Sequence, residues 1–504
     1  MSEHRAFFGT IALSTVNAVR LGLQLLVLPI LARILGPDAF GLVGLAIPII
    51  LLAGMMCDAG MGNALVRHPN PSWELENTAF WLSLGAGIGI TVIVCLLAWP
   101  LAAAFSQPAL APVLAVLSLI ITIGGALAVS NARISRSRNF GVFAIGELLA
   151  LILCSAAGIY AALRGWGYWS LVVQQLVLWL TKTFWLFPVA GFKPGFYFKP
   201  SLAKPFLRFG LNSVAANIAD FIGKNIPSLV VGGALGVNAL GHYSMANQLA
   251  RVPEMVISGP VNLSTFTAVA QLRDGEAVRS FVLRSLRMIA TVLALLFGGL
   301  YVTADLATNL LLGPKWVETA PVLAALAPAV FCLGLYSFMG AVLLGLGNSG
   351  RQFKLTLLLG VAMFIGSLAG TRFSVVSVGT GLSVGAVALA PLYIQALSRE
   401  LRLPMAAIAS TLIAPLAAAI VMGCVVFAIR GEIAHLNELW QLLIAVGASV
   451  FSFVVALACF VGRRFLDDLR TLHPGIKADV QRLSASEEEL LSFDGALLAE
   501  RVKE

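Results

Sequence analysis

The sequence contains few charged residues for its length. Only 11% of its 504 residues are Asp, Glu, Lys or Arg, whereas 59% are hydrophobic. Soluble domains contain about 25% charged residues, so this composition excludes an ordinary soluble protein. Apolar runs follow one another along nearly the whole chain, and each is long enough to cross a bilayer core of about 30 Å as a helix. The composition therefore predicts an all-α, polytopic membrane protein.

Residues that could support metal, redox or nucleotide chemistry are scarce. The six cysteines lie inside apolar runs without a C-x-x-C pair, which is typical of small packing residues in lipid-embedded helices. The five histidines are scattered over loops and span ends. No Gly-Lys-Ser loop that would cradle a phosphate is present. We therefore expect no metal site, no cofactor and no nucleotide-hydrolysing site.

The hydrophobic pattern predicts about 14 transmembrane helices. The first continues without a small-residue cleavage site, so we interpret it as an uncleaved span and not as a signal peptide. The predicted spans are 7–34, 40–65, 77–105, 109–130, 140–163, 166–190, 206–235, 237–268, 285–311, 317–346, 352–370, 374–397, 404–429 and 438–461.

Positive charges in the connections predict the orientation. With a cytoplasmic N-terminus, the inside loops and the start of the tail contain 20 Lys and Arg residues, against five in the outside loops. The five are Arg33, Arg164, Lys315, Arg372 and Arg430. Both termini are therefore expected inside. Basic loops that face anionic lipid also account for the net charge of +9, so we expect no nucleic-acid partner.

A repeat at an offset of 200 residues divides the chain. Leu35, Gly36, Ala39, Gly41 and Ala46 recur as Leu235, Gly236, Ala239, Gly241 and Ala246. An even number of spans per unit gives both units the same orientation, as in a parallel repeat. We predict two six-helix lobes, an N-lobe over 1–190 and a C-lobe over 206–400. A cytoplasmic inter-lobe linker over 191–205, spans 13 and 14 over 401–461 and a cytoplasmic tail over 462–504 complete the organisation.

Polar residues deep inside three predicted spans mark a candidate site. Placing a charged side chain at mid-bilayer costs at least about 2.5–3.5 kcal/mol of insertion free energy, so such a residue is expected to have a structural or functional role. The residues recur at spacings of three and four, which places each set on one helical face. They are Asn17, Arg20 and Gln24 in span 1, Asn217, Asp220 and Lys224 in span 7, and Asn247, Arg251 and Glu254 in span 8.

Two interpretations of these residues remain open. Asp220 with Lys224, and Arg251 with Glu254, could form structural ion pairs within one helical turn. Arg20, about 20 Å from the cytoplasmic end at 1.5 Å per residue, has no acid in its own helix. A water-filled cavity between the lobes accounts for all three polar stripes. Asp58 and Glu147, nearer the cytoplasmic ends of their spans, are weaker candidates.

Several segments resemble the polysaccharide transporter family of bacterial lipid-linked oligosaccharide flippases, the Wzx type. The resemblance covers roughly residues 7–400 and is close to the branch with the colanic-acid flippase. This family belongs to the multidrug/oligosaccharidyl-lipid/polysaccharide exporter superfamily. The matching segments are Leu31–His68, Asn131–Phe140 (NARISRSRNF), Ser228–Pro253 (SLVVGGALGVNALGHYSMANQLARVP) and Leu311–Val322 (LLGPKWVETAPV).

The resemblance implies two lobes, alternating access, a location in the bacterial inner membrane and an undecaprenyl-diphosphate-linked oligosaccharide as substrate. Polysaccharide polymerase and export machinery are further expected partners. Guanidinium groups bind phosphate in a planar fork, so Arg20, Lys224 and Arg251 are expected at the diphosphate. Asn17, Asn217 and Asn247 complete the expected substrate site, and Asp220 and Glu254 are candidates for ion coupling.

Two other classes of function were weighed. A small-molecule or organic-cation antiporter on the same fold would need a net acidic cavity, whereas the deep charges here have an excess of one positive charge. A membrane enzyme would need carboxylates or a domain on an outside loop. The longest such loop, expected near Thr303–Trp316, has only Asp305 as an acid. We therefore expect a transporter and not an enzyme.

Overall fold

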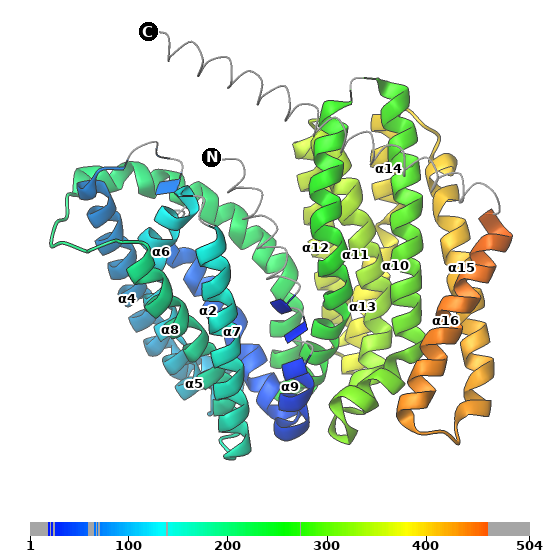
Figure 1. Cartoon of the computed structure of the whole chain (residues 1–504), viewed down its shortest axis with the longest axis horizontal. Coiled ribbons are helices and arrows are strands. Elements are labelled where there is room, and N and C mark those ends of the chain that lie inside the picture. Colours follow the sequence, from blue (N-terminus) through cyan, green and yellow to red (C-terminus); the bar gives the residue numbers. More distant parts are fainter. Residues whose placement is uncertain are drawn as a thin grey trace, which may run out of the picture.

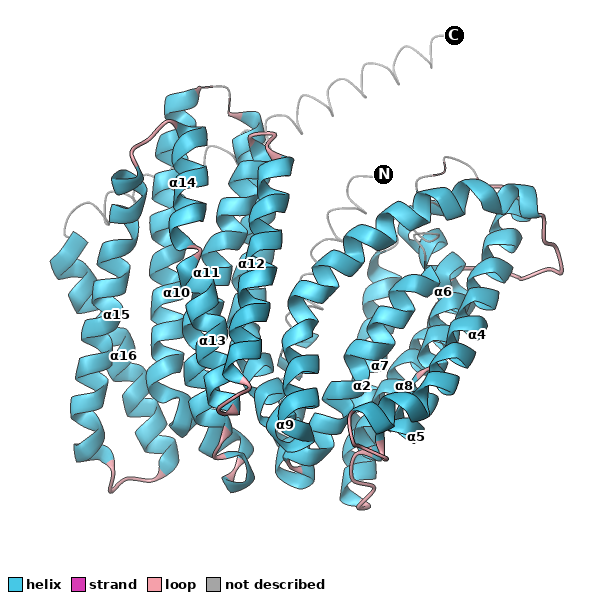
Figure 2. Ribbon diagram, turned by 180° about the vertical axis from the view of Figure 1, so that it is seen from behind, coloured by secondary structure: helices cyan, strands magenta, loops and turns pink. Residues whose placement is uncertain are grey.

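The computed structural model describes residues 19–20, 22–23, 26–58, 65–66, 68, 71–137, 140–272 and 274–461; the side chains of 58, 140, 201–220, 222–224, 255–260, 263 and 461 are not described. This part of the chain is helical and contains no strand (Figure 2). Eleven of its segments are long and apolar enough to cross a membrane, and Leu26–Leu35 is a shorter apolar helix. The prediction of an all-α polytopic membrane protein is confirmed.

The helices form two bundles with a long helix, α9 (Pro200–Gln271), between them (Figure 1). The two bundles lie together at the bottom of Figure 1 and diverge toward the top, where the connection from α8 to α9 lies. The first bundle contains α2 (Pro37–Asp58), α4 (Trp73–Ala104), α5 (Leu110–Leu117), α6 (Leu119–Arg136), α7 (Phe140–Leu163) and α8 (Trp169–Val189).

The second bundle contains the remaining helices. They are α10 (Gly275–Leu312), α11 (Thr319–Gly345), α12 (Ser349–Gly370), α13 (Val375–Ala388), α14 (Ala390–Leu401), α15 (Met405–Ile433) and α16 (Glu438–Val461). The last two helices pack on α10 through an apolar cluster that includes Ala294, Met422 and Phe453. A larger core cluster contains residues of both bundles, among them Leu45 of α2 and Leu323 of α11.

Some predicted boundaries were wrong. Predicted span 4 is two helices that meet at Ser118, and its basic loop is largely helical, because α6 continues to Arg136. Arg133 and Arg136 lie in that last turn, where the helix dipole favours positive charge. The expected long outside loop is also shorter than predicted. Residues 303–312 belong to α10, and Asp305 forms an ion pair with Arg430 of α15.

Two glycines reverse the chain at equivalent positions of the repeat. Gly36 has φ +81° and Gly236 has φ +85°, a backbone region that L side chains rarely adopt. Gly36 separates the helix 26–35 from α2. Gly236 interrupts the helical dihedrals inside α9, so α9 consists of two consecutive helices, 200–235 and 237–271. Both tight connections were predicted from the sequence.

The segments that follow these turns cross each other at very short range. A Cβ atom on Gly41 would lie 1.7 Å from the carbonyl oxygen of Val237, and one on Gly241 would lie 2.1 Å from that of Pro37. Each contact is the other one shifted by 200 positions, which is the pattern a two-fold relation generates. Only glycine allows backbones to approach this closely in a membrane.

Candidate functional site

The described residues include only part of the predicted site. Asn17 and Gln24 lie outside them. Arg20 is helical and its side chain is exposed. Asn217, Asp220 and Lys224 lie on the first half of α9, where the helix is described but these side chains are not. Asp58 ends α2, and Cys57 beside it is buried.

The second half of α9 carries the best-described part of the site. Nε of Arg251 donates a hydrogen bond to Oδ1 of Asn247, 3.2 Å away and one helical turn earlier. Arg251, Asn247 and Glu254 are all half-buried. The structure thus brings two of the predicted substrate-binding residues together. The amide oxygen holds the guanidinium at one edge, and among the described residues none is hydrogen-bonded to the two Nη atoms of Arg251, which can donate to an anionic ligand.

An ion pair inside the first bundle was not predicted. Nζ of Lys182 in α8 lies 2.6 Å from Oε1 of Glu147 in α7, and both side chains are less than one-fifth exposed. Lys182 also lies 5.7 Å from the ring centroid of Trp179. The pair satisfies two charges in the membrane that would be costly alone. Both residues lie at similar distances from the turn between predicted spans 5 and 6, and comparing these distances would have paired them.

At the bottom of Figure 1, the connection from α10 to α11 contacts the end of the helix 26–35. Nε1 of Trp316 donates to the carbonyl of Ala32 at 3.0 Å, and Nζ of Lys315 donates to those of Arg33 and Ile34 at 3.4 and 3.3 Å. Arg33 in turn donates to the carbonyls of Leu310 and Leu311. Basic side chains thus satisfy the carbonyls that helix ends leave without partners.

Further contacts extend this cluster to α2 and α9. Trp316 is fully buried, and its ring meets Phe40 edge to face at a centroid distance of 5.4 Å. His242 of α9 is also buried, with Nδ1 2.8 Å from Oγ1 of Thr319. Nδ2 of Asn238 donates to Oδ1 of Asp38 at 2.9 Å, so repeat-equivalent residues touch. We call these contacts, from Arg33 to Thr319, the closed-end cluster.

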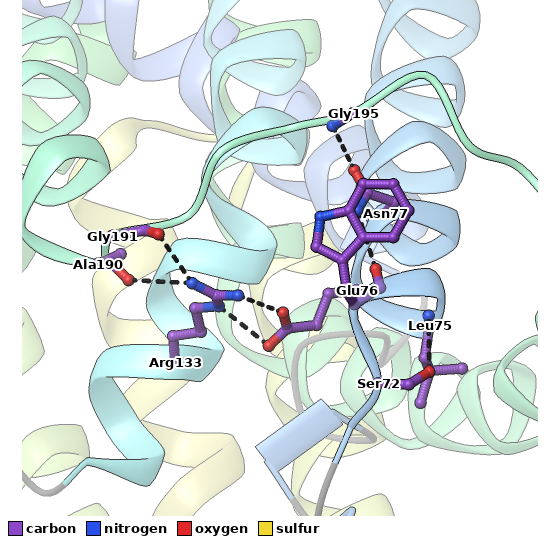
Figure 3. Close-up of polar contacts among 9 residues, drawn as sticks. Ser72, Leu75, Glu76, Asn77, Arg133, Ala190, Gly191 and Gly195 are labelled. Carbon is purple, nitrogen blue, oxygen red and sulfur yellow. Dashed lines mark hydrogen bonds and ion pairs between the residues drawn. The ribbon is translucent and has the colours of Figure 1, made fainter.

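The linker between the bundles is fixed at the opposite end (Figure 3). Arg133 of α6 donates to both carboxylate oxygens of Glu76, at 3.0 and 2.5 Å, and to the carbonyls of Ala190 and Gly191. Oδ1 of Asn77 accepts from the backbone N–H of Gly195 at 2.6 Å. Glu76 is only 5% exposed, so this charge is paired inside the protein. These bonds hold the start of the linker against α4 and α6.

The described part of the chain is a helical, multi-pass membrane fold in which polar side chains such as those of Glu147 and Lys182 are paired inside a bundle. Residues 30–321 match the family described as "Polysaccharide biosynthesis protein". The match covers more than half of the chain and includes both glycine turns and Arg251. The chain belongs to this family, and the resemblance to polysaccharide transporters stated from the sequence is confirmed.

Two relatives and one solved structure are similar to the chain. The succinoglycan biosynthesis transport protein ExoT of Rhizobium meliloti (strain 1021) is 30% identical over 342 residues, 68% of this chain and 69% of its own. The lipopolysaccharide biosynthesis protein WzxC of Escherichia coli (strain K12) is 27% identical over 350 residues, 68% and 70% of the two chains. The lipid II flippase MurJ, in an inward closed conformation, shares the fold with a TM-score of 0.70 at 13% identity, over 90% of this chain and 99% of its own.

Proposed function

We propose that the protein is a flippase that moves undecaprenyl-diphosphate-linked oligosaccharide repeat units from the cytoplasmic to the outer leaflet of the bacterial inner membrane. The proposal rests mainly on the family membership. The region that matches the family contains both the α2–α9 crossing and Arg251. Relatives named as transport and biosynthesis proteins of succinoglycan and lipopolysaccharide support a lipid-linked glycan as cargo. The protein carries out transport and not a covalent reaction on the sugar.

Arg20, Lys224 and Arg251 bind the diphosphate in this proposal, and Asn17, Asn217 and Asn247 bind neighbouring oxygens or hydroxyls. The Arg251–Asn247 hydrogen bond supports this assignment, since it orients the guanidinium without neutralising it. A charge-assisted bond to phosphate is about twice as strong as a neutral one, so three cations give the head group a strong site. The sugar follows the diphosphate because the two are covalently joined.

Translocation requires the site to open alternately to each side of the membrane. With both termini cytoplasmic, the closed-end cluster lies at the outer side, and the chain has its inward-directed form. Residues 1–190 and 206–400 form the two lobes and rock about the α2–α9 crossing. The reciprocal Gly41 and Gly241 contacts support this axis, since they relate one lobe to the other. The outward form requires the closed-end cluster to separate.

The test is transport by the purified full chain in vesicles. A fluorescent undecaprenyl-diphosphate-linked oligosaccharide is placed in both leaflets, and a membrane-impermeant quencher reports the fraction that changes side. Flipping above the rate of empty vesicles is the expected result. Absence of flipping, together with exchange of an organic cation for protons in the same vesicles, would identify the antiporter instead.

A further inference from the structure

A cavity of about 500 Å³ lies inside the first bundle, and none of the described residues of the predicted diphosphate site lines it. Its size falls within the range of about 300–1,000 Å³ that is typical of ligand sites. One wall is a face of α6 on which lining residues recur every three or four positions from Ile120 to Ser135. At 1.5 Å per residue this wall is about 22 Å long. The cavity is therefore long and narrow, and we call it the tail slot.

The lining of the tail slot is mostly apolar, with Gln175 of α8 on one wall and a polar end formed by α6. Ile50 and Leu51 of α2 and Trp179 of α8 form the other walls. It is not sealed, because Leu51 remains 47% exposed. Asn131 and Ser135 line it near the end of α6, whose last turn contains two arginines. The side-chain oxygen of Asn131 is buried and has no hydrogen-bond partner among the described residues.

We propose that the tail slot binds the part of the substrate's isoprenoid chain that is attached to the diphosphate. This inference rests on the proposed function. The long apolar wall fits a hydrocarbon chain. The end of α6 with Asn131 and Ser135 lies on the side from which a substrate of the cytoplasmic leaflet enters, so the head group would lie at the polar end of the slot and the chain along its apolar wall. Asn131 accepts a hydrogen bond from a hydroxyl of the head group.

The energetic contribution of the tail slot is limited by its surroundings. An isoprenoid chain in a bilayer is already out of water, so the hydrophobic effect gives no gain on entry. The gain comes from dispersion contacts, which are small singly and large in sum. Binding in the slot also keeps the chain beside the lobe that moves. The slot therefore contributes more to the preference for long-tailed substrates than to the affinity for the head group.

Two glycines offer a way to fill the tail slot without disturbing the helices. A Cβ atom on Gly124 would contact only the ring of Trp179, at 3.7 Å, and one on Gly54 would meet nothing within 4 Å. Gly124→Leu and Gly54→Leu therefore narrow the slot. Gly85 of α4 also has nothing within 4 Å, is exposed and does not line the slot, so Gly85→Leu is the matched control.

The first experiment maps where the chain lies. The lipid-linked oligosaccharide carries a diazirine near the diphosphate end of its isoprenoid chain, and the full protein in vesicles is irradiated and digested. We expect adducts on peptides of α2, α6 and α8 around Ile50, Gly124 and Trp179, displaced by unlabelled substrate. A parallel arm uses a phospholipid with a diazirine in its acyl chain. Adducts there from the phospholipid alone, or substrate adducts only on other helices, overturn the proposal.

The second experiment compares transport of the native tail with that of a dimethylallyl-diphosphate analogue bearing the same oligosaccharide, whose single isoprene unit is too short to reach Gly124, about 10 Å along α6 from Asn131. Gly124→Leu and Gly54→Leu should slow the long-tailed substrate about tenfold while leaving the short-tailed one unchanged. Gly85→Leu should change neither. Equal rates for the long tail in wild type and slot variants overturn the proposal, and so do equal losses for both tails in variants with the wild-type melting temperature. If the wild type moves neither substrate, the proposed function itself fails.

Discussion

At the scale of single residues, the proposed diphosphate site depends most on the arginine of α9. Nε of Arg251 donates to Asn247, and its two Nη atoms are the donors proposed to bind the diphosphate. Lysine has the same charge but no fork, so the two residues are not equivalent at a bidentate phosphate site. Arg20 is exposed and is the second arginine of the predicted site.

We predict that Arg20→Ala and Arg251→Ala abolish vesicle transport while the protein remains in the membrane. Loss of a charge-assisted phosphate contact of about 1.5–3 kcal/mol predicts at least about a tenfold loss of rate. Arg251→Lys should retain part of the activity. The control is Arg164→Ala, which removes an arginine that stacks on Tyr160 in the turn after α7. Wild-type transport by both alanine variants would contradict the assignment.

The Glu147–Lys182 pair makes a different prediction, because its charges are already satisfied. Removing one member leaves a charge without a partner in the membrane and should lower stability by about 3–5 kcal/mol. Glu147→Gln and Lys182→Met should therefore each reduce the melting temperature strongly, whereas the double variant should recover most of the loss. The measurement is a double-mutant cycle of thermal unfolding in detergent. Additive losses would show that the pair is not coupled.

At the scale of elements, the crossing of α2 and α9 depends on the absence of side chains. The oxygens that a Cβ would meet at Gly41 and Gly241 belong to the backbone, so they cannot rotate away. We predict that Gly41→Ala and Gly241→Ala each destabilise the protein by at least about 1–3 kcal/mol. Gly85→Ala, in open space on α4, should be neutral or slightly stabilising. Melting curves in detergent that are equal for all three variants would contradict the crossing.

The sequence predicted the existence of most helices because each span has an apolar run of membrane length. Gly36 and Gly236 predicted the tight turns because glycine readily adopts the left-handed backbone conformation that such a turn requires. Helix ends outside the apolar run were not predictable from hydropathy. Asp274 caps α10 by accepting from the backbone N–H groups of residues 276 and 277, so α10 begins before its apolar segment does. The break at Ser118 has no glycine or proline to indicate it.

The candidate site was predictable only in part. The depth of a residue in the membrane can be estimated by counting along its span, but the contacts that it makes with other spans cannot be derived in this way. The spacing of four between Asn247 and Arg251 places them on one helical face, and the structure has them in contact. Lys182 has no acidic residue in its own helix, and its partner Glu147 belongs to another helix. The closed-end cluster joins residues far apart in the sequence, such as Lys315 and Arg33, which are 282 positions apart, so no local pattern could indicate it.

At the scale of the whole molecule, an ion can bias the rocking of the lobes only if it binds their two states differently. Asp220 and Glu254 are the proposed coupling residues, each one turn from a basic residue. We predict that Asp220→Asn and Glu254→Gln remove the response of transport to an imposed proton or sodium gradient while substrate binding is retained. Gradient dependence equal to wild type in both variants would make these acids static partners of the nearby cations.

The closed-end cluster allows a direct test of whether the lobes must separate during transport. Asp38 and Asn238 share a hydrogen bond across the crossing, and they are equivalent positions of the repeat. In a variant without its native cysteines, Asp38→Cys with Asn238→Cys places two thiols at this contact. We predict that oxidation cross-links the pair and stops vesicle transport, because the outer side can no longer open. Reduction should restore the rate.

The matched control cross-links two helices within one bundle. Asp305 of α10 and Arg430 of α15 form an ion pair at the same side of the molecule, and both belong to the second bundle. Asp305→Cys with Arg430→Cys should therefore cross-link without loss of transport, since lobes that move as rigid bodies keep internal distances fixed. Continued transport by the oxidised Asp38–Asn238 variant would mean that the closed-end cluster does not open. Inhibition by both cross-links would mean instead that the second bundle changes shape during the cycle.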